Sequence, residues 1–375
     1  MNYIYPIAHA LNSYSTTGII VVCGIAGYNL LAADIALTQA ALMALFFSLS
    51  ANARSLILSD DNHHSPISFF KKRTILVMPL MIISIFISMY VSGVGIFIAA
   101  IISIRKSSEW LSEIVLSLYE KQQNNIIISI VLTIEVIFLF ATVISIFLAP
   151  ALTIKVILIW SILPLLLVIH FLLHLDREKQ SGALKLQLIM PHITSTLIIG
   201  MTVFIFRNMI LFFTNKNISG EIFVAIAIGG LVANLFSTSF GPSVVLHKAR
   251  NSENKLPLII NFANTLTLLI GIALICYFWV FNSAAEFFGK TEFFWTALGC
   301  SLVGSFIMVY AIEKRLNILQ LLKDKSVLVP DSISNFLILL QVPVLYMIFG
   351  SESFVALYIG SAIINLLVYE YCSKQ

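Results

Sequence analysis

Long apolar runs follow one another along almost the whole chain, separated by short polar or turn-forming segments. A helix needs about 20 mostly apolar residues to cross the hydrocarbon core of a bilayer, so these runs predict about twelve transmembrane helices. The first and fourth runs are rich in polar residues. The predicted spans are residues 4–26, 33–57, 74–92, 94–115, 125–147, 151–174, 187–213, 220–246, 256–281, 291–312, 327–349 and 353–372.

The amino-acid composition supports the same class of protein. Hydrophobic residues make up 59% of the 375 residues and charged residues only 11%, and the mean hydropathy is +0.99. Because soluble domains carry about 25% charged residues, most of the surface of this chain is expected to face lipid. The predicted fold class is therefore an all-α polytopic membrane protein.

The positions of the 22 lysines and arginines predict how the helices are oriented. With the N-terminus in the cytoplasm, 16 of these residues fall in cytoplasmic segments and three on the outer side, a bias that follows the positive-inside rule. Both termini are then expected to be cytoplasmic. The lysines left on the outer side are Lys155, Lys216 and Lys290, and the basic residues left within spans are Arg105, Lys106 and Arg207.

A polar cytoplasmic break near the middle divides the predicted spans into two sets of six. The expected organisation is an N-lobe at residues 1–175, a linker at residues 176–186 and a C-lobe at residues 187–375. A shift of half the chain lays the second span on the eighth, so that Asp34 meets Glu221 and Ser50 meets Ser237. This match favours a parallel internal repeat, although two apolar helices could also match by chance.

Arg207 lies within the apolar run 191–213. A guanidinium at a helix centre costs about 2.5–3.5 kcal/mol on insertion scales, so such a residue usually faces protein or water. It could line a cavity for cargo, or its long side chain could snorkel to the outer headgroups. The following span carries small residues that favour close helix packing or close approach of a ligand. It also contains Gly241 and Pro242, and the proline should kink the helix.

The fourth predicted span carries several charged residues on one helical face. Arg105 and Glu109 have the i,i+4 spacing of an ion pair, and Lys106 and Glu113 lie close by in the sequence. One interpretation is a helix with a wet inner face, with Glu135 of the fifth span as a counter-charge, since charges within a membrane usually pair. The other is an amphipathic extension at the cytoplasmic surface.

Polar side chains also form stripes on the first and seventh predicted spans. His9 and Asn12 belong to the first stripe. His192 belongs to the second stripe, which Arg207 adjoins. These stripes could face a common cavity, or they could provide interhelical hydrogen bonds. Arg54, at the cytoplasmic end of the second span, could bind lipid phosphate or line the inner mouth of a cavity.

No pattern predicts enzymatic chemistry. The adjacent His63 and His64 lie in a polar loop and are interpreted as solvated residues, and the four cysteines lack ligand-like spacing. We therefore expect no catalytic residues, no metal, no cofactor and no nucleic-acid partner.

Two regions of the chain resemble bacterial polysaccharide exporters. The first comprises residues 39–41 (QAA) and 50–58 (SANARSLIL), and the second comprises residues 207–210 (RNMI), 221–230 (EIFVAIAIGG) and 240–243 (FGPS). The family is the O-antigen and capsule flippase branch of the multidrug/oligosaccharidyl-lipid/polysaccharide (MOP) exporter superfamily. The resemblance covers chiefly the second and eighth spans.

This resemblance implies a V-shaped protein of two six-helix lobes that opens alternately to each side of the bacterial inner membrane. The implied cargo is an oligosaccharide repeat unit linked to undecaprenyl pyrophosphate, for O-antigen, capsule or exopolysaccharide synthesis, with a polymerase and other polysaccharide-assembly proteins as partners. The candidate cargo-binding residues are Arg207, Arg105, Lys106, Arg54, His9, Asn12, His192 and Asn234. The candidate ion-coupling residues are Glu109, Glu113 and Glu135. The candidate kink residues are Gly241 and Pro242.

Two alternative functions remain open from the sequence. One is a multidrug or cation exporter of the same superfamily, which would favour acidic and aromatic residues in its cavity. The other is a membrane-embedded glycan polymerase or ligase. Such enzymes usually need a large outer loop, and no long outer loop is predicted here.

Overall fold

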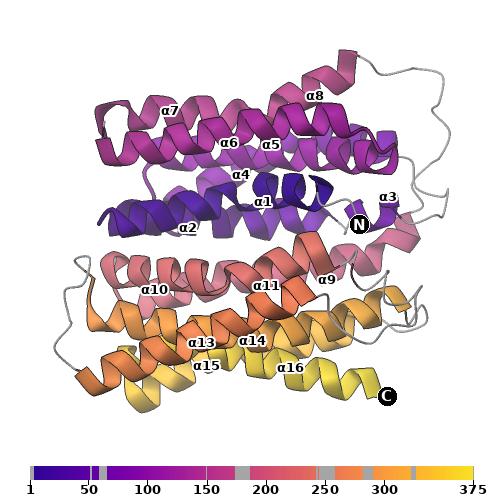
Figure 1. Ribbon diagram of the computed structural model, residues 1–375. Coiled ribbons are helices and arrows are strands. Elements are labelled where there is room, and N and C mark those ends of the chain that lie inside the picture. The colour runs from indigo at the N-terminus through magenta and orange to yellow at the C-terminus, as the bar shows by residue number, and fades with distance from the viewer. Residues whose placement is uncertain are drawn as a thin grey trace. The chain divides into compact units, whose positions relative to one another are not determined.

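The computed structural model is helical throughout the residues it describes (Figure 1). These are residues 4–50, 53–58, 66–148, 150–173, 186–241, 244, 258–281, 290–321 and 327–374. No strand occurs among them, which confirms the all-α prediction for this part of the chain.

Helices in the first half of the chain follow the predicted spans closely. In order they are α1 (Ile4–Ile25), α2 (Asn29–Leu42), the π-helical η1 (Met43–Phe47), the 3-10 helix η2 (Ser48–Ser50), α3 (Ala53–Leu58), α4 (Pro66–Tyr90), α5 (Ile96–Lys121), α6 (Asn125–Leu148), α7 (Pro150–Ile162) and α8 (Pro164–Leu173).

The second half of the chain repeats this pattern of long helices. In order they are α9 (Leu186–Phe213), α10 (Lys216–Gly229), α11 (Leu231–Leu235), the π-helical η3 (Phe236–Phe240), α13 (Leu258–Phe281), α14 (Glu292–Leu321), α15 (Leu328–Phe349), the 3-10 helix η5 (Ser351–Ala356) and α16 (Leu357–Lys374).

The described helices account for the predicted spans. Nine are long and apolar enough to cross a membrane, and the bent pair Lys216–Gly229 and Leu231–Phe240 supplies a tenth. The other two predicted spans are α1, with 22 residues, and α5, with 26. Both are long enough to span, but their polar residues lower their hydropathy. How many helices cross a membrane, and the cytoplasmic position of the termini, stay predictions.

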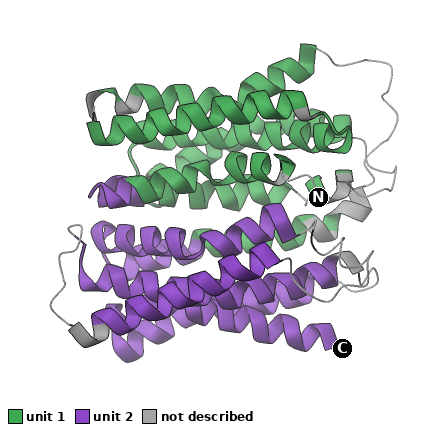
Figure 2. Ribbon diagram, in the orientation of Figure 1, with its two compact units in different colours: residues 1–22, 34–204 green, residues 23–33, 205–375 purple. Residues whose placement is uncertain are grey.

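The chain divides into two compact units (Figure 2). Unit 1 comprises Met1–Val22 and Asp34–Phe204, and unit 2 comprises Cys23–Ala33 and Ile205–Gln375. This division departs from the predicted lobe limits at two places. The first part of α9 packs within unit 1, where Thr196 donates a hydrogen bond of 2.7 Å to the Ser48 carbonyl. The turn between α1 and α2 packs within unit 2.

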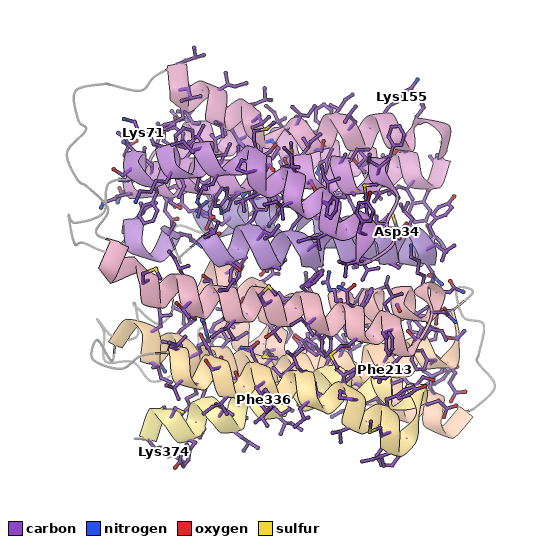
Figure 3. All side chains as sticks on the ribbon, turned by 180° about the vertical axis from the view of Figure 1, so that it is seen from behind. Asp34, Lys71, Lys155, Phe213, Phe336 and Lys374 are labelled. Carbon is purple, nitrogen blue, oxygen red and sulfur yellow. The ribbon has the colours of Figure 1, made fainter. Side chains whose placement is uncertain are left out.

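Labelled residues mark the two ends of the helices in each unit. Figure 3 shows Lys71 and Lys155 at opposite ends of the helices of unit 1, and Phe213 and Lys374 at opposite ends of unit 2. The charge distribution predicts that Lys71 and Lys374 are cytoplasmic and that Lys155 lies outside, and this orientation stays a prediction.

The second span is irregular in the middle, where α2 passes into η1 and then η2. Irregular backbone at membrane depth needs partners for its freed polar groups. The Ser50 hydroxyl supplies one, because it donates to the Phe46 carbonyl over 2.9 Å and itself accepts from the Trp110 indole N–H over 2.9 Å. Arg73 supplies another by donating to the Ser50 carbonyl over 3.4 Å. The eighth span contains a π-helical segment as well, so both spans that the predicted internal repeat relates share this feature.

The eighth span bends by 57° between α10 and α11. The bend lies at Gly230, whose Cβ, if present, would come within 2.8 Å of the Tyr358 hydroxyl. A Cβ on Gly229 would collide with Ser301. These glycines therefore serve close helix packing in this structure. The predicted kink falls further along, where Gly241 follows η3 and Pro242 lies outside the described residues; that kink stays a prediction.

Candidate functional site

Helix α5 turns its charged face into the interior of unit 1. Arg105 has no exposed surface and Glu109 is 2% exposed. A single helix of 26 residues contains both, so the interpretation of a short surface extension after Ile104 is wrong for Arg105. A buried charge must be paired and hydrogen-bonded to be tolerated, and the neighbouring helices supply those partners.

All five N–H groups of the Arg105 guanidinium have an acceptor. Nε donates to Glu109 Oε1 over 2.7 Å, and Nη1 donates to Glu135 Oε2 over 3.3 Å and to the Trp160 carbonyl over 2.9 Å. Nη2 donates to the Ser15 hydroxyl over 2.7 Å and to Glu135 Oε1. The guanidinium also lies 4.2 Å from the centroid of the Trp160 ring. Arg105 thus joins α1, α5, α6 and α7.

These contacts confirm two predicted ion pairs. Arg105 pairs with Glu109 at i,i+4 and with Glu135 of the fifth span. Lys106 completes the cluster, with Nζ 3.2 Å from Glu109 Oε2. With two cations and two carboxylates the cluster is electrically neutral when all four groups are ionised. We call Arg105, Lys106, Glu109 and Glu135 the central cluster.

Lys106 is the accessible end of the central cluster. Its side chain is 18% exposed, whereas the side chains of Arg105 and Glu109 are 0% and 2% exposed. An ammonium has three donors, and Glu109 accepts from one of them. An incoming anion could therefore meet Lys106 without disturbing the fully paired guanidinium of Arg105.

A small cavity adjoins the central cluster. Asn12, Ser112 and Glu135 contribute its polar lining, and its volume of about 20 Å³ is enough for about one water molecule. Asn12 is held in place by a hydrogen bond of 2.8 Å from Ser112 and by one of 3.2 Å to the Glu109 carbonyl. The predicted stripe on the first span thus faces α5, where it makes helix–helix hydrogen bonds. A cavity common to the stripes of the first and seventh spans stays a prediction.

A second charged cluster joins α1, α3 and α5. Arg54 pairs with Glu120 through two hydrogen bonds of 3.2 Å each. His9 Nε2 lies 3.2 Å from Glu120 Oε2. Arg54 is only 8% exposed. In this structure it therefore binds a carboxylate within unit 1, and the interpretation as a lipid-phosphate anchor does not describe it.

Arg73 pairs with Glu113, another carboxylate of α5. It was not predicted as a site residue. It lies 2.7 Å from Glu113, donates to the Trp110 carbonyl and covers the Trp110 ring at 4.7 Å. The sequence suggested a cytoplasmic loop residue, because Lys71 and Lys72 precede it. A signal was present: Phe69, Phe70 and Arg73 share one face at helical spacing, and all three are buried.

Three further cargo candidates lie outside unit 1 or outside the described side chains. Arg207 belongs to unit 2, and its guanidinium lies 5.6 Å from the centroid of the Phe223 ring on α10. Asn234 lies on α11, also in unit 2, and its carbonyl accepts from Ser237 over 2.9 Å. His192 lies in α9, but its side chain is outside the described part of the structure.

Unit 2 contains a buried ion pair that was not predicted from the sequence. Asp331 has no exposed surface and binds Arg315 through two hydrogen bonds of 2.9 Å each. The Tyr369 hydroxyl donates to the same carboxylate over 2.6 Å. This site links α14, α15 and α16. All the hydrogen bonds named lie within the unit, which indicates a role in packing.

Ionisable groups buried on apolar, membrane-length helices define a polytopic membrane protein with a polar interior in each unit. No family model matches the sequence, and no curated protein matches it. Solved structures do match. The lipid II flippase MurJ, in an inward closed conformation, has a TM-score of 0.63 at 14% identity, covering 96% of this chain and 87% of that chain.

Two MATE transporters match over a similar length. The eukaryotic transporter AtDTX14 has a TM-score of 0.61 at 10% identity, covering 99% of this chain and 94% of its own. VcmN of Vibrio cholerae, in the bent form, has a TM-score of 0.60 at 14% identity, covering 99% and 95%. The chain therefore shares its overall fold with these solved structures over nearly its whole length.

Proposed function

We propose that this protein is a flippase that moves an undecaprenyl-pyrophosphate-linked oligosaccharide from the cytoplasmic to the periplasmic leaflet of the bacterial inner membrane. The product would serve O-antigen, capsule or exopolysaccharide synthesis. The fold supports this proposal, because one of the similar structures is described as a lipid II flippase.

The observation that carries the proposal is the number of cationic side chains embedded in the helices. Arg105 and Lys106 lie in the middle of α5, and Arg207 lies in α9 beside an aromatic ring. Such charges are rare in spans and usually serve function. Arginine and lysine are the side chains that bind phosphate, so an anionic pyrophosphate head is the cargo chemistry that fits them.

We assign the residues to roles as follows. Lys106 and Arg207 make the first contacts with the pyrophosphate, while Arg105 keeps the central cluster in place. Arg54 takes part when Glu120 releases it. The polar groups proposed to meet sugar hydroxyls are His9, Asn12, His192 and Asn234. The groups proposed to exchange protons or ions are Glu109, Glu113 and Glu135, and the proposed hinge residues are Gly241 and Pro242.

One observation favours the alternative function as a multidrug or cation exporter. Glu109 and Glu135 are 2% and 7% exposed, and buried carboxylates suit a cationic cargo. Each is paired with Arg105 in this structure, however, so a cation would first have to displace the arginine. The flippase proposal needs no such exchange, because an anion can add to Lys106.

Complementation of a strain that lacks its own flippase tests the proposal. Wild-type protein should restore surface glycan, and Lys106→Gln and Arg207→Gln should each reduce it at equal protein level. Lys155→Gln is the matched control, because Lys155 is exposed at the opposite end of unit 1 from Lys71. Full export by both Lys106→Gln and Arg207→Gln would contradict the assigned roles, and efflux of cationic dyes without glycan export would favour the alternative.

A further inference from the structure

Tyr369 fixes the rotation of α16 about its own axis. Its hydroxyl donates to the fully buried Asp331 on α15 over 2.6 Å, and Tyr369 is itself buried. Ser361, two turns earlier, is buried as well and accepts a hydrogen bond from Gln341 of α15. Because these residues face the interior of unit 2, the opposite face of α16 points away from its neighbouring helices.

The outward face of α16 carries an apolar stripe that continues into its last turn. Ile363, Leu367 and Tyr371 recur at intervals of four residues, and they are 43%, 64% and 66% exposed. Residues at this spacing share one face of a helix. A tyrosine near the end of a transmembrane helix is typical of the membrane interface. The stripe therefore has the pattern of a surface that lies against acyl chains and ends at the level of the headgroups.

Two lysines lie where the apolar stripe ends. Lys374, in the last turn of α16, has its ammonium 3.0 Å from one oxygen of Glu370, and the ammonium of Lys314 on α14 lies 2.7 Å from the other oxygen. Figure 3 shows Lys374 at the end of unit 2. The side chains of Lys314, Glu370 and Lys374 are 39%, 34% and 72% exposed. We call these three residues the lysine clamp.

The lysine clamp has one positive charge more than its carboxylate can neutralise. Two ammoniums share the single charge of Glu370, so the net charge of the clamp is +1 when all three groups are ionised. An ammonium has three donors, so each lysine can bind a further oxygen while it stays beside Glu370. The nearby Asp331 is paired with Arg315 through two hydrogen bonds of 2.9 Å. A phosphodiester, with one negative charge and two terminal oxygens, complements the clamp.

We propose that the lysine clamp and the apolar stripe of α16 together bind one anionic phospholipid of the cytoplasmic leaflet. The phosphodiester contacts the ammoniums of Lys314 and Lys374, and an acyl chain lies along the stripe. The leaflet follows from the predicted orientation, in which both lysines are cytoplasmic, and anionic headgroups attract basic residues near the membrane surface. The site is independent of the proposed cargo, because no residue assigned to cargo contact takes part in it.

Glu370 competes with the lipid for the two ammoniums. Its carboxylate holds both lysines in place, but in the bound state its negative charge lies close to the phosphate. Like charges repel, and the repulsion is stronger where the low-dielectric lipid lies alongside. Neutralising Glu370 should therefore tighten the binding of an anionic lipid. If the clamp served only to hold α16 against α14, the same change would weaken the site.

Native mass spectrometry of the purified protein in an uncharged detergent tests the site. Phosphatidylglycerol and phosphatidylcholine with the same acyl chains are added in equal amounts, and the bound fractions are compared. The wild-type protein should prefer phosphatidylglycerol. Lys314→Gln and Lys374→Gln should each lower this preference about fivefold, which is the contribution of one lysine at an anionic membrane surface. Glu370→Gln should raise the preference several-fold.

A matched control separates the site from general charge attraction. Lys72→Gln removes an exposed lysine on the same predicted side of the membrane, and it should leave the preference unchanged. Exposed ion pairs contribute little to stability, so all these variants should fold, and their thermal midpoints without added lipid check this. Glycerol 3-phosphate, which has no acyl chains, should not displace the bound lipid at equal concentration.

Three results would overturn the lipid site. An equal loss of preference in Lys72→Gln would mean that the attraction is general and does not depend on the clamp. Weaker binding of phosphatidylglycerol by Glu370→Gln would mean that the clamp is only a packing contact. Displacement by glycerol 3-phosphate at equal concentration would mean that the lysines bind free phosphate and that the apolar stripe contributes nothing.

Discussion

Arg105 and Glu135, which lie 30 residues apart in the sequence, form an ion pair in which the arginine side chain has no exposed surface. Glu109, Ser15 and the Trp160 carbonyl occupy the remaining donors of the guanidinium. A residue whose donors are all used within the protein is a poor first contact for cargo. This difference between adjacent positions of α5 supports the proposal that Lys106, and not Arg105, makes the first contact with an anion.

Removing Arg105 should destabilise unit 1 severely. Arg105→Met leaves the Glu109 and Glu135 carboxylates buried beside one another without their shared cation. Breaking a buried pair by removing one partner costs about 3–5 kcal/mol, so the thermal midpoint of the purified protein in detergent should fall sharply. Lys155→Met, at an exposed lysine, should leave the midpoint unchanged. A midpoint for Arg105→Met that equals the wild-type value would contradict the structural role.

A second variant distinguishes loss of charge from loss of packing. Arg105→Met combined with Glu109→Gln and Glu135→Gln removes all three charges and keeps similar side-chain volumes. The triple variant also removes the partner of Lys106, whose side chain is 18% exposed and can be solvated in part. It should therefore regain only part of the lost thermal stability, by removing the two buried unpaired carboxylates. If the triple variant unfolds at the same temperature as Arg105→Met, the carboxylates alone do not account for the penalty.

Trp110 should stabilise the irregular middle of the second span through its indole N–H. Trp110→Phe keeps an aromatic ring over which Arg73 can lie, but it removes the hydrogen bond to the Ser50 hydroxyl. A buried group left without its partner costs about 1–3 kcal/mol. We expect a moderate fall in the free energy of unfolding, measured by urea titration in detergent. Combining Trp110→Phe with Ser50→Ala should cost more than the single change, because it also removes the hydrogen bond of 2.9 Å from the Ser50 hydroxyl to the Phe46 carbonyl.

Close packing of α10 on α14 gives a prediction with a matched control. A methyl group at Gly229 would collide with Ser301, whereas the same group at Gly18 meets open space. Overpacking typically costs about 1–3 kcal/mol, so Gly229→Ala should lower the thermal midpoint and Gly18→Ala should not. Equal midpoints in the two variants would show that α10 and α14 can separate without cost.

The sequence predicted much of the fold because membrane helices follow from simple rules. Apolar length gave the helices, and spacing along α5 gave the Arg105–Glu109 pair. The partners of Arg105 on α1 and α7 could not be predicted, because they depend on how each helix is rotated about its axis. The π-helical segments could not be predicted either, since no residue in Met43–Phe47 breaks a helix in the way that proline does.

Two of the clusters missed from the sequence show a common physical cause. Arg73 lies directly after two lysines and was counted with them as a loop residue. Lys290 donates a hydrogen bond to the Asn29 side chain over 2.6 Å, but the two residues come from segments far apart in the chain, and each is unremarkable in its local sequence. Only the packing of the turn between α1 and α2 on α10 brings them together. Charges that pair across helices are visible in the sequence as an excess of embedded charge, but their pairing is a tertiary property.

The proposed cargo carries negative charge, so its movement should depend on the membrane potential. One net charge that crosses a potential of 100 mV gains or loses about 2.3 kcal/mol, and a negative interior favours outward movement of an anion. The potential across proteoliposomes can be set with potassium and valinomycin. The initial rate of flipping of a fluorescent undecaprenyl-pyrophosphate glycan should rise several-fold when the side from which the glycan starts is negative. Reversing the potential should lower the rate, and Lys106→Gln should lower it at every potential.

Equal rates at both polarities would mean that a compensating cation or proton crosses with the cargo. In that case Glu109→Gln should restore the dependence on potential, because a glutamine at position 109 could not carry the proton.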